Sequence, residues 1–244
     1  MDIVNLIPMA GEGKRFKDAG YTVPKPLIKV DNLPMVVKAV KSLPLATKNI
    51  FIVRKDHLDV EELRITLNKY FRNNLIIEID YLTDGQASTC LLAEEYIKHD
   101  SILNIGACDI GFEFEEKNYF KLLKSYNSFI WTYTNNPNVL IKPEMYGWVK
   151  LKKDLNEIEY VSCKKPISND LLNDNVVSGT FTFKKAKICF DAIRKMIESK
   201  DTINGEFYLD TIFNYLEENS TILKVKKYSS WGTPQELNNY KYEK

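Results

Sequence analysis

The hydrophobic positions in the first half of the chain follow two alternating patterns. Apolar runs of strand length are separated by segments in which apolar residues recur at intervals of three and four. The strand-like runs cover residues 3–7, 49–53, 75–82, 101–105 and 129–133. The helix-like segments cover residues 35–43, 59–70, 87–98 and 116–126. This alternation predicts an α/β fold, a Rossmann-like three-layer α/β/α sandwich with a mostly parallel, mixed sheet.

The second half of the chain keeps hydrophobic runs but loses the regular alternation. Strand patterns cover residues 148–151, 159–163 and 176–183, and residues 184–199 have the pattern of an amphipathic helix. No composition change marks a domain boundary, so we expect a single domain over residues 1–244. Its second half is expected to form a smaller cap over the ligand side of the sheet.

Charge and composition exclude several classes of protein. Lysine and arginine total 34 against 33 aspartate and glutamate, a formal net charge of +1, so no nucleic-acid partner is expected. No apolar run approaches the ~18 residues that span a bilayer, and the start at Met1 lacks a basic segment, so we expect a cytoplasmic protein without a membrane partner. Two histidines and 4 dispersed cysteines disfavour a histidine triad, a zinc cluster and a disulfide framework.

A glycine-rich loop follows the first predicted strand, at the edge of the sheet where ligands of α/β proteins bind. Only 10 of the 244 residues are glycine, yet Gly11 and Gly13 stand two positions apart. Without side chains, such a turn lets backbone N–H groups approach phosphate oxygens closely, and Lys14 and Arg15 add positive charge. The sequence therefore predicts a phosphate site here.

The two best-known phosphate loops do not fit this segment. A Walker A loop needs a glycine where Pro8 stands and a serine or threonine where Arg15 stands. The dinucleotide fingerprint needs its last glycine where Phe16 stands. Neither a P-loop nor a Rossmann NAD site is predicted.

A second cationic element lies a few residues further on, where Lys25 stands between Pro24 and Pro26. Two fixed φ angles reduce the entropic cost of holding the lysine in place, which suits a phosphate contact. Taken alone, the tripeptide fits a solvated surface lysine equally well or better. Together, the segments 10–16 and 24–27 resemble the nucleotide-binding signature of the sugar-phosphate nucleotidyltransferase family.

Shorter matches to the same family extend over most of the chain. They are residues 84–87 (base recognition), 104–109 (ending in a metal-binding aspartate), 146–149 (acceptor loop), 164–166 (a lysine-proline motif), 205–208 (common in relatives that serve bacterial surface polysaccharides) and 232–234 (a glycine-threonine segment). The resemblance implies catalytic roles for Arg15 and Lys25, nucleotide binding by Ala10, Gly11, Gly13, Lys14 and Gln86, acceptor binding by Tyr146, Gly147, Lys165 and Glu206, and a metal ligand at Asp109.

The cofactor implied by the resemblance is Mg²⁺, which prefers carboxylate, water and phosphate oxygens. Asp109 offers such a carboxylate. The family usually has a second aspartate two residues before the glycine of the glycine-threonine segment, and here that position is Ser230. A hydroxyl is a poor replacement, so either Asp109 holds the ion with help from the triphosphate, or Glu206 or Asp210 supplies the second carboxylate.

The activity implied is nucleotidyl transfer from a nucleoside triphosphate to a phosphorylated small molecule, foremost a sugar 1-phosphate, for cell-surface polysaccharide or capsule synthesis. Residues 1–135 would form the nucleotide-binding core, and residues 136–244 the acceptor-binding half with the C-terminal helices. The resemblance places Arg15 on the leaving pyrophosphate, Lys25 between the two substrates and Lys165 on the acceptor phosphate. Because the acceptor is already an anion, no enzyme nucleophile is needed. We leave open whether the chain forms a homo-oligomer.

Three alternatives stay open from the sequence. One is a cytidylyltransferase for a non-sugar phosphate such as phosphocholine or a phosphorylated amino acid. Another is a glycosyltransferase that consumes a nucleotide sugar, although Asp109-Ile110-Gly111 has only one carboxylate of the usual D-x-D pair. The third is a nucleotide-binding subunit without turnover, which Ser230 would favour.

Overall fold

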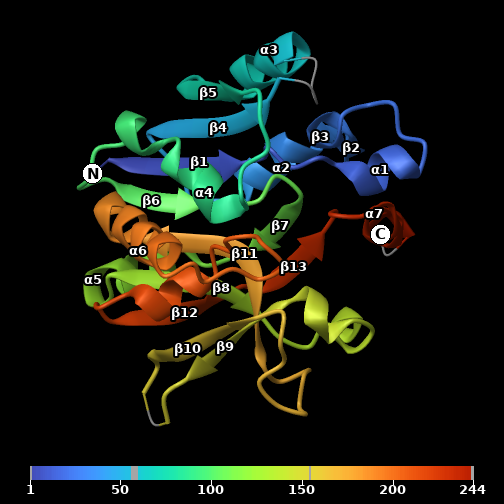
Figure 1. The fold of residues 1–244 in the computed structure, drawn as a ribbon. Helices are drawn as coiled ribbons and strands as arrows, with labels where there is room; N and C mark the ends of the chain where they lie inside the picture. Colours follow the sequence, from blue (N-terminus) through green and yellow to red (C-terminus); the bar gives the residue numbers. More distant parts are fainter. Residues whose placement is uncertain (1, 56–59, 154, 243–244) are drawn as a thin grey trace.

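Within residues 2–55, 60–153 and 155–242, which the computed structural model describes, nine strands form one mixed sheet (Figure 1). These strands are β1 (Ile3–Pro8), β4 (Lys48–Arg54), β5 (Asn74–Ile79), β6 (Ile102–Ile105), β8 (Ser128–Tyr133), β9 (Gly147–Leu151), β10 (Ile158–Cys163), β11 (Asn175–Phe183) and β12 (Ser220–Lys224). The order from one edge is β5-β4-β1-β6-β11, with β8 and then β12 beyond β11.

The N-terminal part of the sheet is parallel, as the alternating pattern predicts. β1 pairs in parallel with β4 on one side and β6 on the other, and β4 pairs in parallel with β5. The residues from Ile3 to Ile7 are all buried, which explains a continuous apolar run. The predicted strand over residues 75–82 is too long, because β5 loses its partner where Arg54, the last residue of β4, pairs with Ile79.

Helices cover both faces of the sheet, which confirms the three-layer sandwich. Val4 and Leu6 of β1 pack on the side of α4 (Gln86–Leu91), α6 (Ala186–Glu198) and the 3-10 helix η5 (Thr211–Tyr215). Ile7 packs on the opposite side with α2 (Met35–Lys41) and α3 (Val60–Tyr70), and Ile3 packs there with α5 (Glu116–Ser125). Because successive strand residues point to opposite faces, one apolar strand serves both layers.

One predicted helix is shorter in the structure, and the start of another cannot be compared with it. The helix expected over residues 87–98 is a shorter α4, followed by a separate 3-10 helix η2 (Glu94–Tyr96). Leu92 N–H and Ala93 N–H donate to carbonyls three residues earlier, so the last turn of α4 tightens and ends. The start of the helix expected from Asp59 lies outside the described residues.

Short elements beyond the carboxyl ends of β1 and β6 were not predicted individually. They are α1 (Lys14–Asp18), η1 (Lys25–Leu27), β2 (Lys29–Val30), β3 (Leu33–Pro34), β7 (Ile110–Glu113), η3 (Pro137–Leu140), η4 (Pro143–Met145), β13 (Lys227–Ser230) and α7 (Pro234–Tyr242), the last of which belongs to the expected C-terminal helical part. α1 and α7 lie together at this end (Figure 1), where Phe16 packs with Trp231 and Leu237.

A small antiparallel pair of strands joins the segment that follows Asp109 to the segment that precedes α7. β7 follows the loop after β6, and β13 precedes α7. They pair with Ser230 opposite Ile110, and Trp231 N–H donates to the Asp109 carbonyl over 2.8 Å. The position of the Ser230–Gly232 segment is therefore fixed relative to Asp109.

Buried polar side chains hold the strands around β6 in register. Asn104 donates to Asn5 on β1 over 3.0 Å and accepts from Tyr119 and Thr182, while Trp131 donates to Thr182 over 2.9 Å. Because these five side chains satisfy one another, a slip of β6 would leave several of them without a partner. This network fixes the strand that leads to Asp109.

The second half of the chain completes the same sheet. β11 pairs antiparallel with β8 along both its early and its later residues. On its other edge, the later residues pair with β6 and the first residues pair with β9. The register shifts between Val177 and Phe181, around Gly179 with a φ of 83°. The β9–β10 hairpin diverges there and lies away from β4 and β5 (Figure 1).

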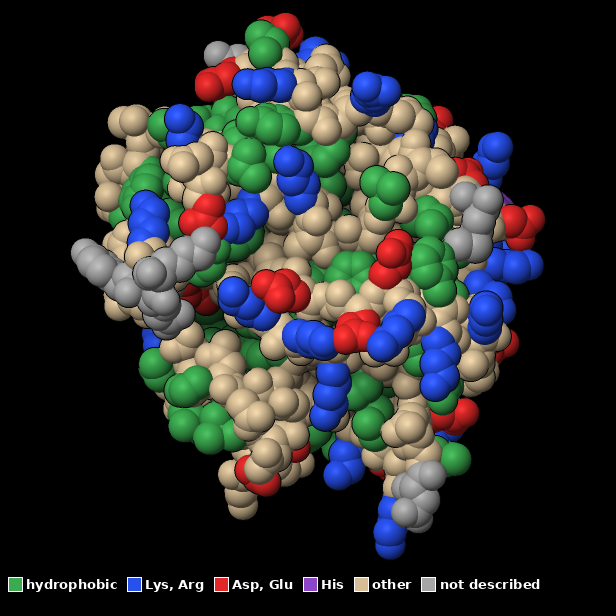
Figure 2. Space-filling view, turned by 180° about the vertical axis from the view of Figure 1, so that it is seen from behind, with side chains coloured by type: hydrophobic (Ala, Val, Ile, Leu, Met, Phe, Trp, Pro, Cys, Tyr) green, Lys and Arg blue, Asp and Glu red, His purple; other side chains and the backbone are tan. Residues whose placement is uncertain are grey.

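The surface carries both signs of charge. Figure 2 shows basic and acidic side chains interspersed over one face rather than gathered by sign. Any site for a strongly anionic ligand must therefore come from a local grouping of cations.

In the described part of the chain, no helix combines the length and the apolar character that a membrane crossing requires.

Candidate functional site

The glycine-rich loop lies directly after β1, as predicted. Gly13 has a φ of 62° and precedes α1, and its carbonyl accepts from the N–H of Phe16 over 3.1 Å. A Cβ built on Gly11 would meet no atom within 4 Å, so the backbone there borders open space. The loop therefore presents main chain that a ligand can approach, with Lys14 and Arg15 on the adjoining turn.

Lys25 is held against Asp109 at the edge of the same space. Pro26 is buried below it, and the lysine Nζ donates to Asp109 Oδ2 over 2.5 Å. Their side chains are only 16% and 18% exposed. The tripeptide alone favoured a solvated surface lysine, but in the structure Lys25 is a largely enclosed cation, 5.7 Å from the centre of the Phe16 ring.

Burial and the charge of Asp109 change the pKa values of Lys25 and of the neighbouring Cys108. Burial alone would lower the pKa of Lys25, but the charge of Asp109 and their hydrogen bond outweigh it, so the pKa of Lys25 is raised. The ammonium therefore keeps its charge well above neutral pH. Burial, with the charge of Asp109, raises the pKa of the Cys108 thiol to about 12, so this cysteine stays a neutral thiol rather than a nucleophile.

A cleft of about 520 Å³ joins these elements. The predicted site residues that line it are Gly11, Gly13, Lys14, Arg15, Lys25, Gln86, Asp109 and Glu206, and Gly232 lines it as well. Ala10 does not line the cleft, because it is 5% exposed and packs into the core beneath the loop. With Lys17 and Glu12, which also line it, four cations, three carboxylates and a glycine-rich backbone border one space, which suits a phosphate-rich ligand with a bound cation.

Gln86 reaches the cleft through a close contact between two distant segments. Gly85, with a φ of 107°, precedes α4, and a Cβ on it would lie 2.6 Å from the backbone nitrogen of Phe207. Ala87 N–H donates to the Phe207 carbonyl over 3.1 Å, and Phe207 N–H donates to the Asp84 carbonyl over 2.8 Å. A glycine at position 85 is therefore required for the segments carrying Gln86 and Glu206 to meet.

Three predicted acceptor residues lie outside this cleft. Lys165 is exposed in a turn where its carbonyl accepts from Ser162. Gly147 faces Asp210, since a Cβ on it would lie 2.2 Å from Asp210 Oδ2. Tyr146 lines a second cavity of about 530 Å³, whose other lining includes Glu236. The structure thus brings together the predicted nucleotide and metal residues with Glu206 and places the other acceptor residues apart from them.

The space beside Gly232 tests whether these residues fit a divalent cation. A Cβ on Gly232 would lie 3.1 Å from Asp109 Oδ2, 3.4 Å from Glu236 Oε2 and 3.6 Å from Ser230 Oγ. Three hard oxygen atoms therefore border one small space, which is the ligand chemistry of Mg²⁺. Among the residues that the structure describes, no group of three acidic, histidine or cysteine side chains forms a complete protein-only metal site. The residues fit an ion that is completed by water and substrate phosphate.

Glu236 was missed by the sequence reasoning, although a signal for its position exists. Thr233 and Glu236 have the spacing of a capping box at the start of α7. In the structure Glu236 N–H donates to Thr233 Oγ1 over 3.1 Å, and that hydroxyl donates to Glu236 Oε2 over 3.0 Å. The cap turns the carboxylate back toward Gly232.

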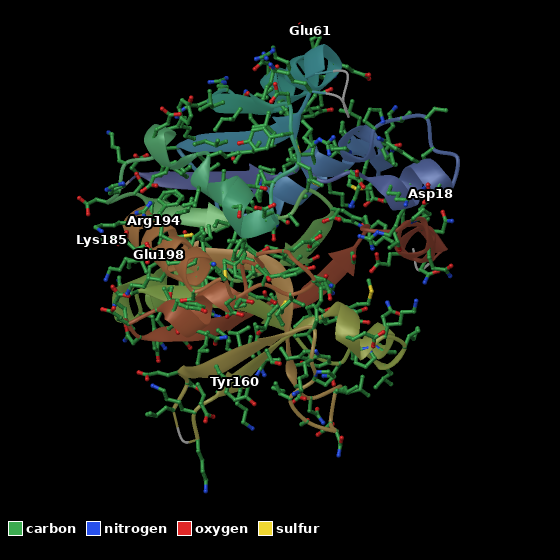
Figure 3. All side chains as sticks on the ribbon, in the orientation of Figure 1. Asp18, Glu61, Tyr160, Lys185, Arg194 and Glu198 are labelled. Atoms are coloured by element: carbon green, nitrogen blue, oxygen red, sulfur yellow. The ribbon has the colours of Figure 1, made fainter. Side chains whose placement is uncertain are left out.

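A further cavity of about 730 Å³ lies at the other end of the sheet and offers no comparable chemistry. Figure 3 shows Lys185, Arg194 and Glu198 there, on and beside α6, far from Asp18 of α1. Its charged lining residues pair with acidic neighbours, as Lys187 does with Asp191, Arg194 with Glu94 and Lys195 with Glu217. We assign this cavity to a solvated, ion-paired surface.

Comparisons with known proteins match nearly the whole chain to one family. The family model described as "Nucleotidyl transferase" matches residues 4–239, nearly the whole chain. The chain belongs to the nucleotidyl transferase family. This match spans the glycine-rich loop, Lys25, Asp109 and Gly232, and it confirms the resemblance inferred from those segments.

Individual members of the nucleotidyl transferase family show how far the likeness extends. A mannose-1-phosphate guanyltransferase of Yarrowia lipolytica is 31% identical over 125 residues, 46% of this chain and 34% of that protein. The bifunctional protein GlmU of Methanococcus aeolicus is 26% identical over 242 residues, 97% of this chain and 53% of that protein. The chain therefore spans about half or less of the curated relatives it matches.

A solved structure gives the same fold. The crystal structure of the nucleoside-diphosphate-sugar pyrophosphorylase from Vibrio cholerae superposes with a TM-score of 0.81 at 21% identity, covering 97% of this chain and 98% of that one. This likeness confirms the three-layer α/β architecture.

Proposed function

We propose that this protein transfers a nucleotidyl group from a nucleoside triphosphate to a phosphorylated small-molecule acceptor and releases pyrophosphate. The observation that carries the proposal is the enclosed Lys25–Asp109 pair, which borders the same cleft as the open backbone at Gly11. A fixed cation and a fixed carboxylate beside a glycine-rich turn match what two phosphate groups and a divalent ion need.

The chemistry requires alignment of two anions rather than an enzyme nucleophile. An oxygen of the acceptor phosphate attacks the α-phosphorus, a new P–O bond forms, and the bond from the α-phosphorus to the bridging oxygen breaks as pyrophosphate leaves. Two unit charges 4 Å apart repel by about 4 kcal/mol at an effective dielectric constant near 20. We assign Lys25 to both phosphate groups and Arg15 to the leaving pyrophosphate, which offsets this repulsion.

The metal and the base have separate positions in the proposal. Asp109 would hold Mg²⁺, which, when bound, supplies positive charge to the phosphates. Gly11, Gly13 and Lys14 bind the triphosphate, with Ala10 shaping the loop from below. Gln86, across the cleft, has the donor and acceptor groups that a base edge needs.

We propose that the acceptor is a sugar 1-phosphate, bound by the second half of the chain. The named activity of the Yarrowia lipolytica relative supports this class. The predicted acceptor segments also touch one another, because Lys164 N–H donates to the Tyr146 carbonyl over 2.9 Å and so joins Gly147 and Lys165 to one region. The similarity of residues 205–208 to relatives that serve surface polysaccharides supports a product used in polysaccharide synthesis.

The experiment is a screen of four nucleoside triphosphates against phosphorylated acceptors, with pyrophosphate release as the readout. The acceptors are sugar 1-phosphates, phosphocholine and phosphorylated amino acids. We expect release for at least one pair, abolished when the acceptor is omitted. Release of nucleoside diphosphate from a nucleotide sugar would instead indicate a glycosyltransferase. Triphosphate binding in a calorimeter with no product from any acceptor would indicate a binding subunit.

A further inference from the structure

The sequence does not show which residue supplies the second carboxylate of the proposed metal site. Ser230 stands where the family has an aspartate, and Glu206 and Asp210 were the acidic candidates. This inference rests on the proposed function, because Mg²⁺ enters as the ion of that reaction.

Asp210 does not fit the role. It is 7% exposed, its Oδ1 accepts from Thr211 N–H, and its Oδ2 faces Gly147 rather than Asp109. Burial raises the pKa of Asp210, which disfavours the ionised form that a metal ligand needs. Its oxygens are therefore engaged elsewhere.

Glu206 borders the cleft but is tied to another part of its wall. The chain around Glu206 is held to the Gln86 segment by the backbone contacts of Phe207. Burial, followed by the nearby Glu206 carboxylate, raises the pKa of the Tyr208 phenol. The three atoms nearest the missing Cβ of Gly232 do not include an oxygen of Glu206.

Glu236 has the placement that the other two lack. Its Oε2 and Asp109 Oδ2 lie 3.4 Å and 3.1 Å from the same point, the Cβ that Gly232 does not have. Ser230 Oγ lies 3.6 Å from the same point, so both carboxylates and this hydroxyl border one space.

The fold explains why this arrangement is stable. Pairing of β7 with β13 fixes Ser230 opposite Ile110, and α7 begins directly afterwards. Thr233 caps α7 and directs the Glu236 carboxylate toward Gly232. Because Mg²⁺ keeps several waters and needs only one or two protein carboxylates, two carboxylates that border one small space suffice.

We propose that Glu236 supplies the second carboxylate of the divalent-cation site beside Asp109, in place of the aspartate that Ser230 replaces. The competing explanation is that Glu236 only caps α7. The capping role and the metal-ligand role differ in whether they need the negative charge of the carboxylate. A cap needs only a hydrogen-bond acceptor, which glutamine also provides, whereas a cation needs the negative charge.

The test measures binding of Mn²⁺ alone, as an oxygen-ligated stand-in for Mg²⁺, from the paramagnetic resonance signal of the free ion. The variants are Glu236→Gln, Glu206→Gln and the matched control Glu116→Gln, which changes an exposed glutamate in the first turn of α5. We expect Glu236→Gln to raise the Mn²⁺ dissociation constant by at least about tenfold with an unchanged Tm. Glu206→Gln and Glu116→Gln should retain the affinity of the unaltered protein.

A rescue variant separates charge from structure. Adding Ser230→Asp to Glu236→Gln returns a carboxylate to the same space, so we expect most of the lost Mn²⁺ affinity to return. Unchanged affinity in Glu236→Gln, or a double variant that stays weak, would overturn the proposal. Because this titration needs no turnover, its failure is distinguishable from an absence of pyrophosphate release, which would contradict the proposed function.

Discussion

Lys25→Ala is expected to lower kcat for pyrophosphate release by about 10²–10³-fold, the size of effect seen when one charge-stabilising donor is lost. The ammonium lies 2.5 Å from Asp109 in a largely enclosed position, so its positive charge is held in a fixed place beside the carboxylate. Its loss also exposes the approaching phosphates to the uncompensated charge of Asp109. Steady-state pyrophosphate release gives kcat and KM separately.

The fold should survive this change far better than the activity. Lys25 borders a solvent-connected cleft, so Asp109 can be rehydrated when its partner is removed, and we expect Tm to fall by no more than about 5 °C. The matched control is Lys29→Ala, an exposed lysine four residues further along the same segment. Near-normal turnover in Lys25→Ala would contradict the role of this lysine.

Asp109→Asn is expected to abolish metal-dependent turnover. An amide oxygen lacks the charge that holds Mg²⁺, and the substitution also leaves the Lys25 ammonium without its anionic partner. We expect kcat to fall by about 10²-fold or more and the Mg²⁺ concentration giving half-maximal activity to rise by at least about tenfold. The measurement is pyrophosphate release across a Mg²⁺ titration.

The control for this prediction changes an aspartate at the other end of the same strand. Asp100 stands just before β6 and is exposed, 3.2 Å from Lys185. Asp100→Asn should retain the full activity and the full metal dependence. A metal response in Asp109→Asn equal to that of Asp100→Asn would remove Asp109 from the metal site.

The sequence predicted the parts of the fold whose signals are local. β1, β4 and β6 appear as continuous apolar runs because both of their faces are buried. The β7–β13 pair was missed, because each strand has four residues and its partner lies in the other half of the chain. Tertiary pairing, rather than local pattern, determines such short strands.

The sequence likewise predicted those parts of the candidate site that lie close together along the chain. The loop carrying Gly11 and the position of Lys25 could be found, because they are adjacent in sequence to the first strand. That Gly85 admits the backbone of Phe207, and that Glu236 faces Gly232, depends on contacts between distant segments. The capping spacing of Glu236 was visible, but nothing local indicates that α7 begins beside Asp109.

The most direct test of the central claim is a crystal structure with a non-hydrolysable nucleoside triphosphate analogue and Mg²⁺. The account predicts the phosphates in the cleft of about 520 Å³, against the backbone of Gly11 to Gly13 and within reach of Lys25, with the base toward Gln86. A nucleotide bound in either of the other two cavities, with this cleft empty, would contradict it.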